Sequence, residues 1–540
     1  MAVFESKLDK KSDAYAKNRA DQLEKLAHLR GLEQRAVDAS ERRRPRFEER
    51  GQLTPRDRLA RLLDPGMPFL TLYNMASYCV DDPNRDTSVP GGSVLAGIGY
   101  VSGVRVMIVV DDSGINAGAA TEMGFRKSLE VMRVALKNKL PFIHLVESAG
   151  ANLMTYKVEL WAHGGSVFYM LAKLSAAGVP TLTVLHGPST AGGAYMPGMS
   201  DYNVGVKHNG MAALGGAALV QAATGEVADE RKLGGTEMHA AVTGLMEYLA
   251  EDDAEGILQI REVVGRMGWN EHCPTPPQRE FDEPIYDADE ILGLVPTDYR
   301  VPYDSRELIA RLVDGSNFTE FKARFGPNLV CTQASIFGHP VGLVSNNGPM
   351  GPDEAAKGAH FFQIIDQANV PLVFLNNITG YMVGTEYEQA GMIKHGAKMI
   401  QAAANIRVPK LTFYVGASYG AGNYGMAGLG YEPDFLFSWP AALTGVMGGE
   451  SAAGTMETVA LASAKRRGVE PDMEALAEQR AAIVEIFNSQ EDAFYTSGRM
   501  LDNGIIDPRD TRNVLGFLLG TIWERKNRTL QPNAFGVGRM

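Results

Sequence analysis

The feature that most constrains the fold is a pair of apolar runs that recurs with nearly the same spacing in both halves of the chain. In the first half the runs begin at Pro141 and Pro180, which are 39 residues apart; in the second half they begin at Pro371 and Pro409, which are 38 residues apart. Each run reads as a buried strand followed by a turn. A repeat of this kind predicts two duplicated domains with similar backbones.

The second strand of each pair ends in a turn of small residues. Gly192 lies 12 residues after the proline that opens its strand, and Ala421 lies 12 residues after its own. Small residues after a strand let a helix begin with bare amide groups, which can bind an anion such as an enolate or an oxyanion. Alternatively, they only permit a tight turn and close packing. Recurrence in both halves favours two anion sites, because a reaction that builds negative charge on two partners needs both.

Alternating strand and helix patterns elsewhere predict an α/β protein made of two related domains. Charged residues with helical spacing dominate the amino terminus, and a Pro-rich, acidic stretch separates the two halves. The predicted parts are a helical arm (1–55), an amino-terminal domain (56–269), a linker (270–300) and a carboxyl-terminal domain (301–540).

Composition limits the class of function. A net charge of −12 over 540 residues argues against binding to nucleic acid or to an anionic membrane, since both require clustered positive charge. The three cysteines are far apart, so the sequence predicts neither a disulfide framework nor a cysteine-bound metal site. No apolar run approaches the roughly 18 residues of a membrane span. We therefore expect a cytoplasmic enzyme that acts on small molecules.

The sequence contains other motifs that suggest different functions. Residues 416–420 match the G-x-S-x-G nucleophile elbow, but an α/β-hydrolase places its catalytic histidine after this serine, and all ten histidines lie at or before His395. Gly97, Gly99 and Gly103 lack dinucleotide-loop spacing and fit a β-hairpin better. Neither a phosphate-binding P-loop nor an H-E-x-x-H metal motif occurs. His239 is interpreted as a polar core residue, and the arginines of 42–46 as a solvated helix face or a phosphate-binding group.

Six stretches of the sequence match the pattern of a known family. They are LTPRDRLARLLDPGMPF (53–69), TAGGAYMPGMSDY (190–202), AATGEVADERKLGG (222–235), ANVPLVFLNNITGYMVG (368–384), GAKMIQAAANIRVPKLT (396–412) and DPRDTR (507–512). Together they resemble the carboxyltransferase subunits of biotin-dependent acyl-CoA carboxylases, over roughly residues 50–525. The methylcrotonyl-CoA and geranyl-CoA carboxylase type is the most similar.

The resemblance implies two tandem crotonase-like domains built from spiral ββα units. The amino-terminal domain would bind the acyl-CoA and the carboxyl-terminal domain biotin, with the active site formed between unlike halves of two chains in a homohexamer, a trimer of dimers. Carboxybiotin would release CO2, the biotin anion would take the acidic proton of the substrate, and the enolate would attack the CO2. Because the chain has neither an ATP-binding loop nor a Met-Lys-Met biotinylation sequence, a biotin carboxylase and carrier (alpha) subunit must be a partner. No metal is expected on this subunit.

The resemblance also implies roles for particular residues. The amides of Gly192 and Gly193 would hold the enolate oxygen, and those of Ala421 and Gly422 the ureido oxygen of biotin. The predicted substrate-binding residues are Arg43, Arg46, Ala119, Ala120, Gly150, Ala151, Gly164, Gly165, Ala191 and Tyr195. The predicted biotin-binding residues are Gly380, Tyr381, Tyr419, Gly420, Asn423 and Tyr424.

Only a few residues indicate which acyl group is carboxylated. Tyr424 stands where propionyl-CoA enzymes have an aspartate, whereas residues 115–125 and 152–164 depart from the methylcrotonyl pattern. The pair Gly164 and Gly165 predicts space for a branched or extended acyl chain. Alternatives are a propionyl-CoA or acetyl-CoA carboxyltransferase, a biotin-dependent decarboxylase or transcarboxylase subunit with the same two sites, and an inactive scaffold.

Overall fold

The computed structural model describes residues 3–119, 121–148, 150, 157–346, 348–533 and 536–537. The chain divides into two compact units. The amino-terminal unit comprises Gly31–Pro277 and Gly520–Met540, and the carboxyl-terminal unit comprises Met1–Arg30 and Gln278–Leu519. Two long helices, α1 (Asp13–Glu41) and α20 (Thr511–Asn527), contribute residues to both units.

The amino-terminal unit is built on a sheet of order β1-β2-β3-β4-β5-β6-β8, with β7 paired to the end of β5. The strands are β1 (Leu70–Thr71), β2 (Val94–Val101), β3 (Val104–Asp111), β4 (Phe142–Ser148), β5 (Thr181–Thr190), β6 (Tyr202–Val206), β7 (Met211–Ala213) and β8 (Tyr248–Ala250). β2 and β3 form an antiparallel hairpin, and β3 to β6 run parallel. The parallel strands are almost fully buried, which explains their continuous apolar sequences.

The carboxyl-terminal unit repeats this topology in a sheet of order β14-β13-β12-β11-β10-β9, with β15 paired to the end of β13. The strands are β9 (Thr319–Glu320), β10 (Leu329–Ile336), β11 (His339–Asn346), β12 (Leu372–Ile378), β13 (Lys410–Tyr419), β14 (Phe435–Ser438) and β15 (Leu443–Gly445). Each unit therefore consists of an antiparallel hairpin that continues into parallel strands. The register is irregular at matching places too, between Val146 and Ser148 and between Asn376 and Ile378.

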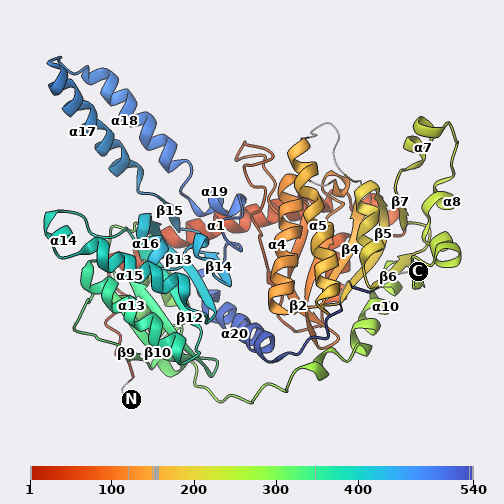
Figure 1. Ribbon diagram of the computed structural model, residues 1–540, viewed down its shortest axis with the longest axis horizontal. Coiled ribbons are helices and arrows are strands. Elements are labelled where there is room, and N and C mark those ends of the chain that lie inside the picture. Colours follow the sequence, from red (N-terminus) through yellow and green to blue (C-terminus); the bar gives the residue numbers. More distant parts are fainter. Residues whose placement is uncertain are drawn as a thin grey trace. The chain divides into compact units, whose positions relative to one another are not determined.

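Helices surround the sheet of each unit, and some pack on it whereas others extend away from it (Figure 1). In the amino-terminal unit they are α2 (Arg44–Glu49), α3 (Pro55–Leu62), α4 (Glu122–Asn138), α5 (Val158–Ala176), α6 (Tyr195–Met199), α7 (Ala217–Thr224), α8 (Glu230–Gly234), α9 (Thr236–Met238) and α10 (Asp253–Arg266). In the carboxyl-terminal unit they are α11 (Ile291–Leu294), α12 (Ser305–Ala310), α13 (Pro352–Gln367), α14 (Thr385–Gln389), α15 (Met392–Asn405), α16 (Gly420–Gly425), α17 (Gly449–Arg467), α18 (Met473–Asn488) and α19 (Ala493–Gly498).

Each sheet packs one face on a core of buried apolar side chains. In the amino-terminal unit Val106, Ile108 and Val110 alternate along β3 and pack with Ile257 and Ile260 of α10. In the carboxyl-terminal unit the equivalent core joins β10 to β12 with α13 and α15. The predicted α/β fold with two duplicated units is confirmed. Within the described residues no helix is both long and apolar enough to cross a bilayer.

Candidate active site

The amino-terminal turn joins β5 to a short 3-10 helix, Ala191–Ala194, that runs into α6. Ala191 adopts a left-handed conformation with φ of +54°, which is uncommon for a residue with a side chain. Thr190 occupies the N-cap position, but its side chain makes no capping hydrogen bond. The N–H groups at the start of a helical turn have no acceptor inside the turn, so they can donate hydrogen bonds to a ligand. Gly192 is exposed and Gly193 is half-buried.

The carboxyl-terminal turn has the same construction. β13 ends at Tyr419, α16 begins at Gly420, and no side chain caps the helix. Gly420 has φ of +56°, close to the value of the residue at the matching position of the other turn. Ala421 is exposed and Gly422 is buried. The two units therefore present the predicted donor amides on turns of one backbone type.

Close packing explains why the turns need small residues. A Cβ added at Gly193 would lie 2.8 Å from Ser189 Oγ, and one added at Gly422 would lie 2.6 Å from Ile378 Cγ1. Real Cβ atoms essentially never approach this closely, so in each unit either the neighbouring side chain or the turn would have to move. At Gly192 the nearest atom would be Phe168 Cζ at 3.4 Å, at the edge of ordinary contact. Tight packing therefore accounts for the small residues at Gly193 and Gly422, and the donor role of the amides stays a prediction.

An arginine-rich cavity of about 210 Å³ lies in the amino-terminal unit at the carboxyl ends of β4 and β5. It is lined by Arg43, Arg46, Phe47, Arg50, Gln52, Ser113, Ala117, Glu147, Ser148 and Pro188. The predicted pair Arg43 and Arg46 is present, and Arg50 extends it with the i, i+3, i+7 spacing of one helix face. No ion pair is found for these three guanidinium groups within the described residues. Such groups suit a phosphate.

Arg44, which belongs to the same basic run, does not line this cavity. Arg44 donates to Glu41 at 2.5 Å and to Asp57 at 2.9 Å. These partners raise the pKa of Arg44, through hydrogen bonds with Glu41 first and Asp57 second. Arg44 is therefore part of the structure of the arm and not of the cavity.

Other predicted substrate-binding residues lie around the same strand ends. Gly150 has φ of +79°, and a Cβ there would lie 3.7 Å from the carbonyl oxygen of Thr190. The Ser148 hydroxyl donates to the carbonyl oxygen of Gly118 at 2.7 Å, which holds the segment before Ala119 against β4. Ala120 and Ala151 lie outside the described residues.

Helix α5 approaches the turn through Phe168, which lies 3.4 Å from a Cβ added at Gly192. Trp161, Gly164, Gly165 and Phe168 follow helical i, i+3, i+4, i+7 spacing. The Phe168 ring stacks edge-on with Tyr195 at 5.7 Å between centroids. A Cβ on Gly165 would meet nothing within 4 Å, and one on Gly164 would be 3.9 Å from Phe125 Cε1. The two glycines thus leave space on α5, and of the nearby aromatic residues Tyr195 was predicted from the sequence whereas Phe168 was not.

A buried charge network underlies the cavity, and the sequence reasoning missed it too. Arg58 Nη1 donates to Glu147 at 2.6 Å and Arg58 Nε donates to Asp253 at 2.9 Å. His186 Nδ1 pairs with Asp253 at 2.7 Å, and Gln52 donates to the carbonyl oxygen of His186 at 2.9 Å. Burial alone would raise the pKa of Asp253, but His186 and Arg58 lower it to about 2. The network ties the ends of β4 and β5 to α3 and α10.

The predicted biotin-binding residues gather in the carboxyl-terminal unit. Gly380 has φ of +123° and follows β12. Tyr381 packs against Gly425 and Gly396, and burial raises the pKa of its phenol. Tyr424 is 49% exposed and stacks on Tyr431 at 5.8 Å.

Tyr419 and Asn423 have inward-facing side chains. The Tyr419 hydroxyl donates to Glu491 at 2.8 Å, and burial followed by this bond raises the pKa of Tyr419. Asn423 Nδ2 donates to Ser418 Oγ at 2.8 Å and to Tyr414 Oη at 2.9 Å.

The competing motifs have structural explanations. Ser418, the serine of the G-x-S-x-G match, is fully buried and accepts hydrogen bonds from two asparagines. His239 uses both ring nitrogens, with Thr243 Oγ1 at 2.8 Å and the carbonyl oxygen of Ala212 at 2.7 Å. In the part of the chain that the structure describes, no group of three or more His, Cys, Asp or Glu side chains is placed to hold a metal ion.

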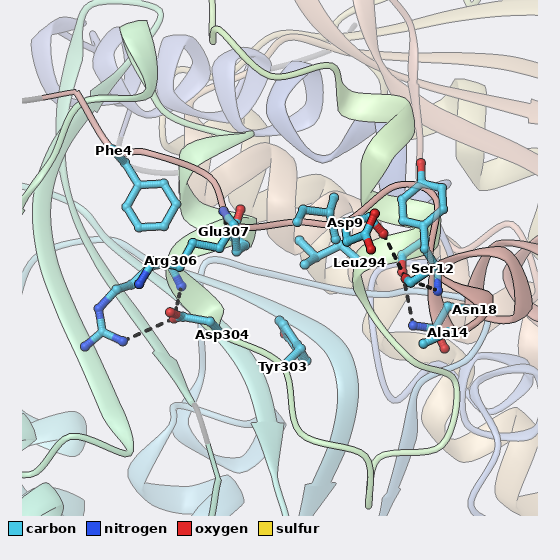
Figure 2. A pocket seen from close by; sticks show the side chains of 14 residues that line it. Phe4, Asp9, Ser12, Ala14, Asn18, Leu294, Tyr303, Asp304, Arg306 and Glu307 are labelled. Atoms are coloured by element: carbon cyan, nitrogen blue, oxygen red, sulfur yellow. Dashed lines mark hydrogen bonds and ion pairs between the residues drawn. The ribbon is translucent and has the colours of Figure 1, made fainter.

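A larger cavity of about 560 Å³ lies in the carboxyl-terminal unit between the amino-terminal segment and residues 293–307 (Figure 2). Its rim includes the ion pair of Arg306 with Asp304 at 3.1 Å. None of the predicted site residues lines it. This cavity is therefore not part of the predicted site.

Comparison with known proteins shows the family of the chain. The sequence matches the carboxyl transferase domain family over residues 46–537. The probable biotin-dependent acyl-coenzyme A carboxylase beta2 subunit of Mycobacterium tuberculosis is 43% identical and covers 100% of both chains. The biotin-dependent 3-methylcrotonyl-coenzyme A carboxylase beta1 subunit of the same organism is 43% identical and covers 94% of both. The beta subunit of P. aeruginosa geranyl-CoA carboxylase has a similar structure, with TM-score 0.92, 45% identity and 100% coverage of both chains.

The fold and the paired turns thus define a crotonase-like carboxyltransferase. The chain belongs to the carboxyl transferase family, as a carboxyltransferase subunit of the biotin-dependent acyl-CoA carboxylase type.

Proposed function

We propose that this subunit transfers the carboxyl group of carboxybiotin, carried by a separate alpha subunit, to a branched or unsaturated acyl-CoA of the methylcrotonyl-CoA kind. The observation that supports this most is the pair of uncapped turns, one in each duplicated unit, which both begin with a residue in the left-handed conformation. The similarity to 3-methylcrotonyl-CoA and geranyl-CoA carboxylase subunits favours this substrate class.

In this proposal the protein acts by placing main-chain donors. The amides of Gly192 and Gly193 stabilise the enolate oxygen of the thioester, and those of Ala421 and Gly422 stabilise the ureido oxygen of biotin. Biotin itself supplies the CO2 and the base. Donors that are already oriented are worth several kcal/mol each in a site from which water is excluded. The buried network below the first turn keeps its strands in place.

The acyl-CoA would be held along the amino-terminal unit. Arg43, Arg46 and Arg50 would bind phosphates of coenzyme A, because guanidinium groups form paired hydrogen bonds with phosphate oxygens. The thioester would then reach the turn at Gly192. From there the acyl chain would extend over Gly164 and Gly165, where α5 leaves space beside Phe168.

We also propose a homohexameric core, a trimer of dimers, in which the amino-terminal unit of one chain meets the carboxyl-terminal unit of another. Exposed apolar side chains on both units support an assembly, since large apolar patches mark interfaces. On α17 they include Met456 and Val459, at 45% and 53% exposure; α5 and α7 contribute Trp161 at 73% and Leu219 at 58%.

Purification of the native complex tests the function. We expect the subunit to co-purify with a biotinylated partner, and the complex to carboxylate 3-methylcrotonyl-CoA or geranyl-CoA faster than acetyl-CoA in the presence of ATP and bicarbonate. Turnover of only the shortest acyl groups would refute the substrate class. A partner set without an ATP-dependent biotin carboxylase would favour a decarboxylase or transcarboxylase instead.

A further inference from the structure

The two turns are not held in the same way, although their backbones match. Ser189 and Ser418 occupy the same position, two residues before the left-handed residue of each turn. Five residues after each serine, directly after the second donor amide, the amino-terminal unit has Ala194 and the carboxyl-terminal unit has Asn423. The side chain at this position therefore distinguishes the two sites.

Asn423 uses both protons of its amide inside the protein. Nδ2 donates to Ser418 Oγ at 2.8 Å and to Tyr414 Oη at 2.9 Å, and both acceptors belong to β13. A Cβ at Gly428 would overlap Asn423 Oδ1, so glycine is required there for this side chain to fit. Asn423 is thus bonded to the strand that leads into the turn.

The network continues behind the turn. Asn376 Nδ2, on β12, donates to the same Ser418 hydroxyl at 3.3 Å and to the carbonyl oxygen of Met426 at 3.2 Å. Burial raises the pKa of Tyr414 to about 12, and its bond with Asn423 opposes this shift. In the amino-terminal unit, by contrast, the buried Ser189 hydroxyl has no hydrogen-bond partner within the described residues.

We infer that Asn423 is a positioning residue for the carboxyl-terminal turn: its two hydrogen bonds to β13 fix the orientation of the Ala421 and Gly422 amides. Asn423 lies in the same short helix, α16, as Ala421 and Gly422, so its hydrogen bonds to β13 hold the helical turn that carries both amides. Donors stabilise a developing charge only while they are held in place. This role depends on the proposed function and differs from direct contact between Asn423 and biotin.

The test measures transfer of the carboxyl group from the carboxylated acyl-CoA to free biotin by the purified full-length protein. Asn423→Ala should lower kcat on the order of tenfold, because the amides lose their fixed orientation. The KM for the acyl-CoA should not change, because its binding residues lie in the other unit. The matched control is Asn405→Ala, which removes an exposed asparagine whose amide donates to the carbonyl oxygen of Gln401 in its own helix at 2.8 Å; we expect wild-type kinetics.

Tyr414→Phe provides a second variant that preserves packing. It deletes one of the two acceptors and should lower kcat in the same direction by a smaller factor, again with unchanged KM for the acyl-CoA. Wild-type kcat in both variants would overturn the role of Asn423, and so would a parallel loss of acyl-CoA affinity and melting temperature, which indicates general destabilisation. A wild-type protein without any transfer would instead overturn the proposed function, and this role with it.

Discussion

At Gly193 an added Cβ would lie 2.8 Å from Ser189 Oγ, and the two further methyl groups of a valine would bring more atoms into this part of the turn. Gly193→Val should therefore displace the donor amides and lower kcat of the reconstituted complex by at least about 100-fold, the usual effect of losing one such donor. Gly31→Val, on an exposed face of α1 where a Cβ meets nothing within 4 Å, is the control and should keep wild-type kcat. Equal activity of the two variants would refute the donor role.

Because Asp253 is buried and charged, we expect the stability of the folded protein to fall at low pH. Its pKa of about 2 in the folded protein is below the ordinary 3.8, so the folded state holds the charged form more strongly than the unfolded state does. The stabilisation is complete above the unfolded pKa and is lost as pH falls from about 4 to about 2. Asp253→Asn should destabilise the protein by about 3 kcal/mol at pH 7, because Arg58 and His186 lose a buried partner.

The apparent melting temperatures of the wild type and of Asp253→Asn provide the measurement. The difference between them should be constant from pH 7 to pH 5 and should shrink toward pH 3. A difference that does not vary with pH would show that the carboxylate is not the stabilising group.

Residue by residue, the sequence is most informative where partners are close in the chain. The spacing of Arg43 and Arg46 predicts one helix face, and Arg50 could have been added by the same argument. The pairing of Arg58 with Glu147 and Asp253 joins residues 89 and 195 positions apart, and no local pattern encodes it. Asn423 differs from these pairs, because its partners Ser418 and Tyr414 are only five and nine residues earlier in the chain, but the spacing alone does not show that its side chain folds back onto β13.

Among the elements, the duplicated strands and turns could be predicted because buried parallel strands leave continuous apolar runs in the sequence. The short strands β7 and β15 could not, since three residues are too few to show a period. The association of residues 3–30 with the carboxyl-terminal unit was likewise not foreseen. It depends on distant contacts, such as Arg19 with Asp289 at 2.6 Å and Gln22 with the carbonyl oxygen of Val295 at 3.0 Å.

The glycine pair of α5 yields a prediction about acyl-chain length. Gly165→Leu should fold normally, because a Cβ at this position meets nothing within 4 Å. The added side chain would occupy the proposed path of the acyl chain, so the complex should retain turnover of a short acyl-CoA and lose most of its turnover of geranyl-CoA. Steady-state rates over an acyl-CoA series provide the measurement. An unchanged preference would place the acyl chain elsewhere.

At the scale of the whole molecule, the hairpin of α17 and α18 extends away from the sheet of its own unit (Figure 1). Met456 and Val459 are exposed and lie three residues apart on one face of α17. Replacing both with Asp should leave the fold intact and shift the protein to smaller species in analytical ultracentrifugation. A sedimentation profile identical to that of the wild type would show that α17 does not contribute to assembly.

The central claim is that each active site combines the amino-terminal turn of one chain with the carboxyl-terminal turn of another. Gly193→Val and Gly422→Val chains should each be inactive alone. Co-expressed in equal amounts with their biotin-carrying partner, they should recover about a quarter of wild-type activity, because half of the dimers are mixed and each mixed dimer has one intact pair of turns. If the co-expressed complex stays as inactive as the single variants, the two turns act within one chain and the account is wrong.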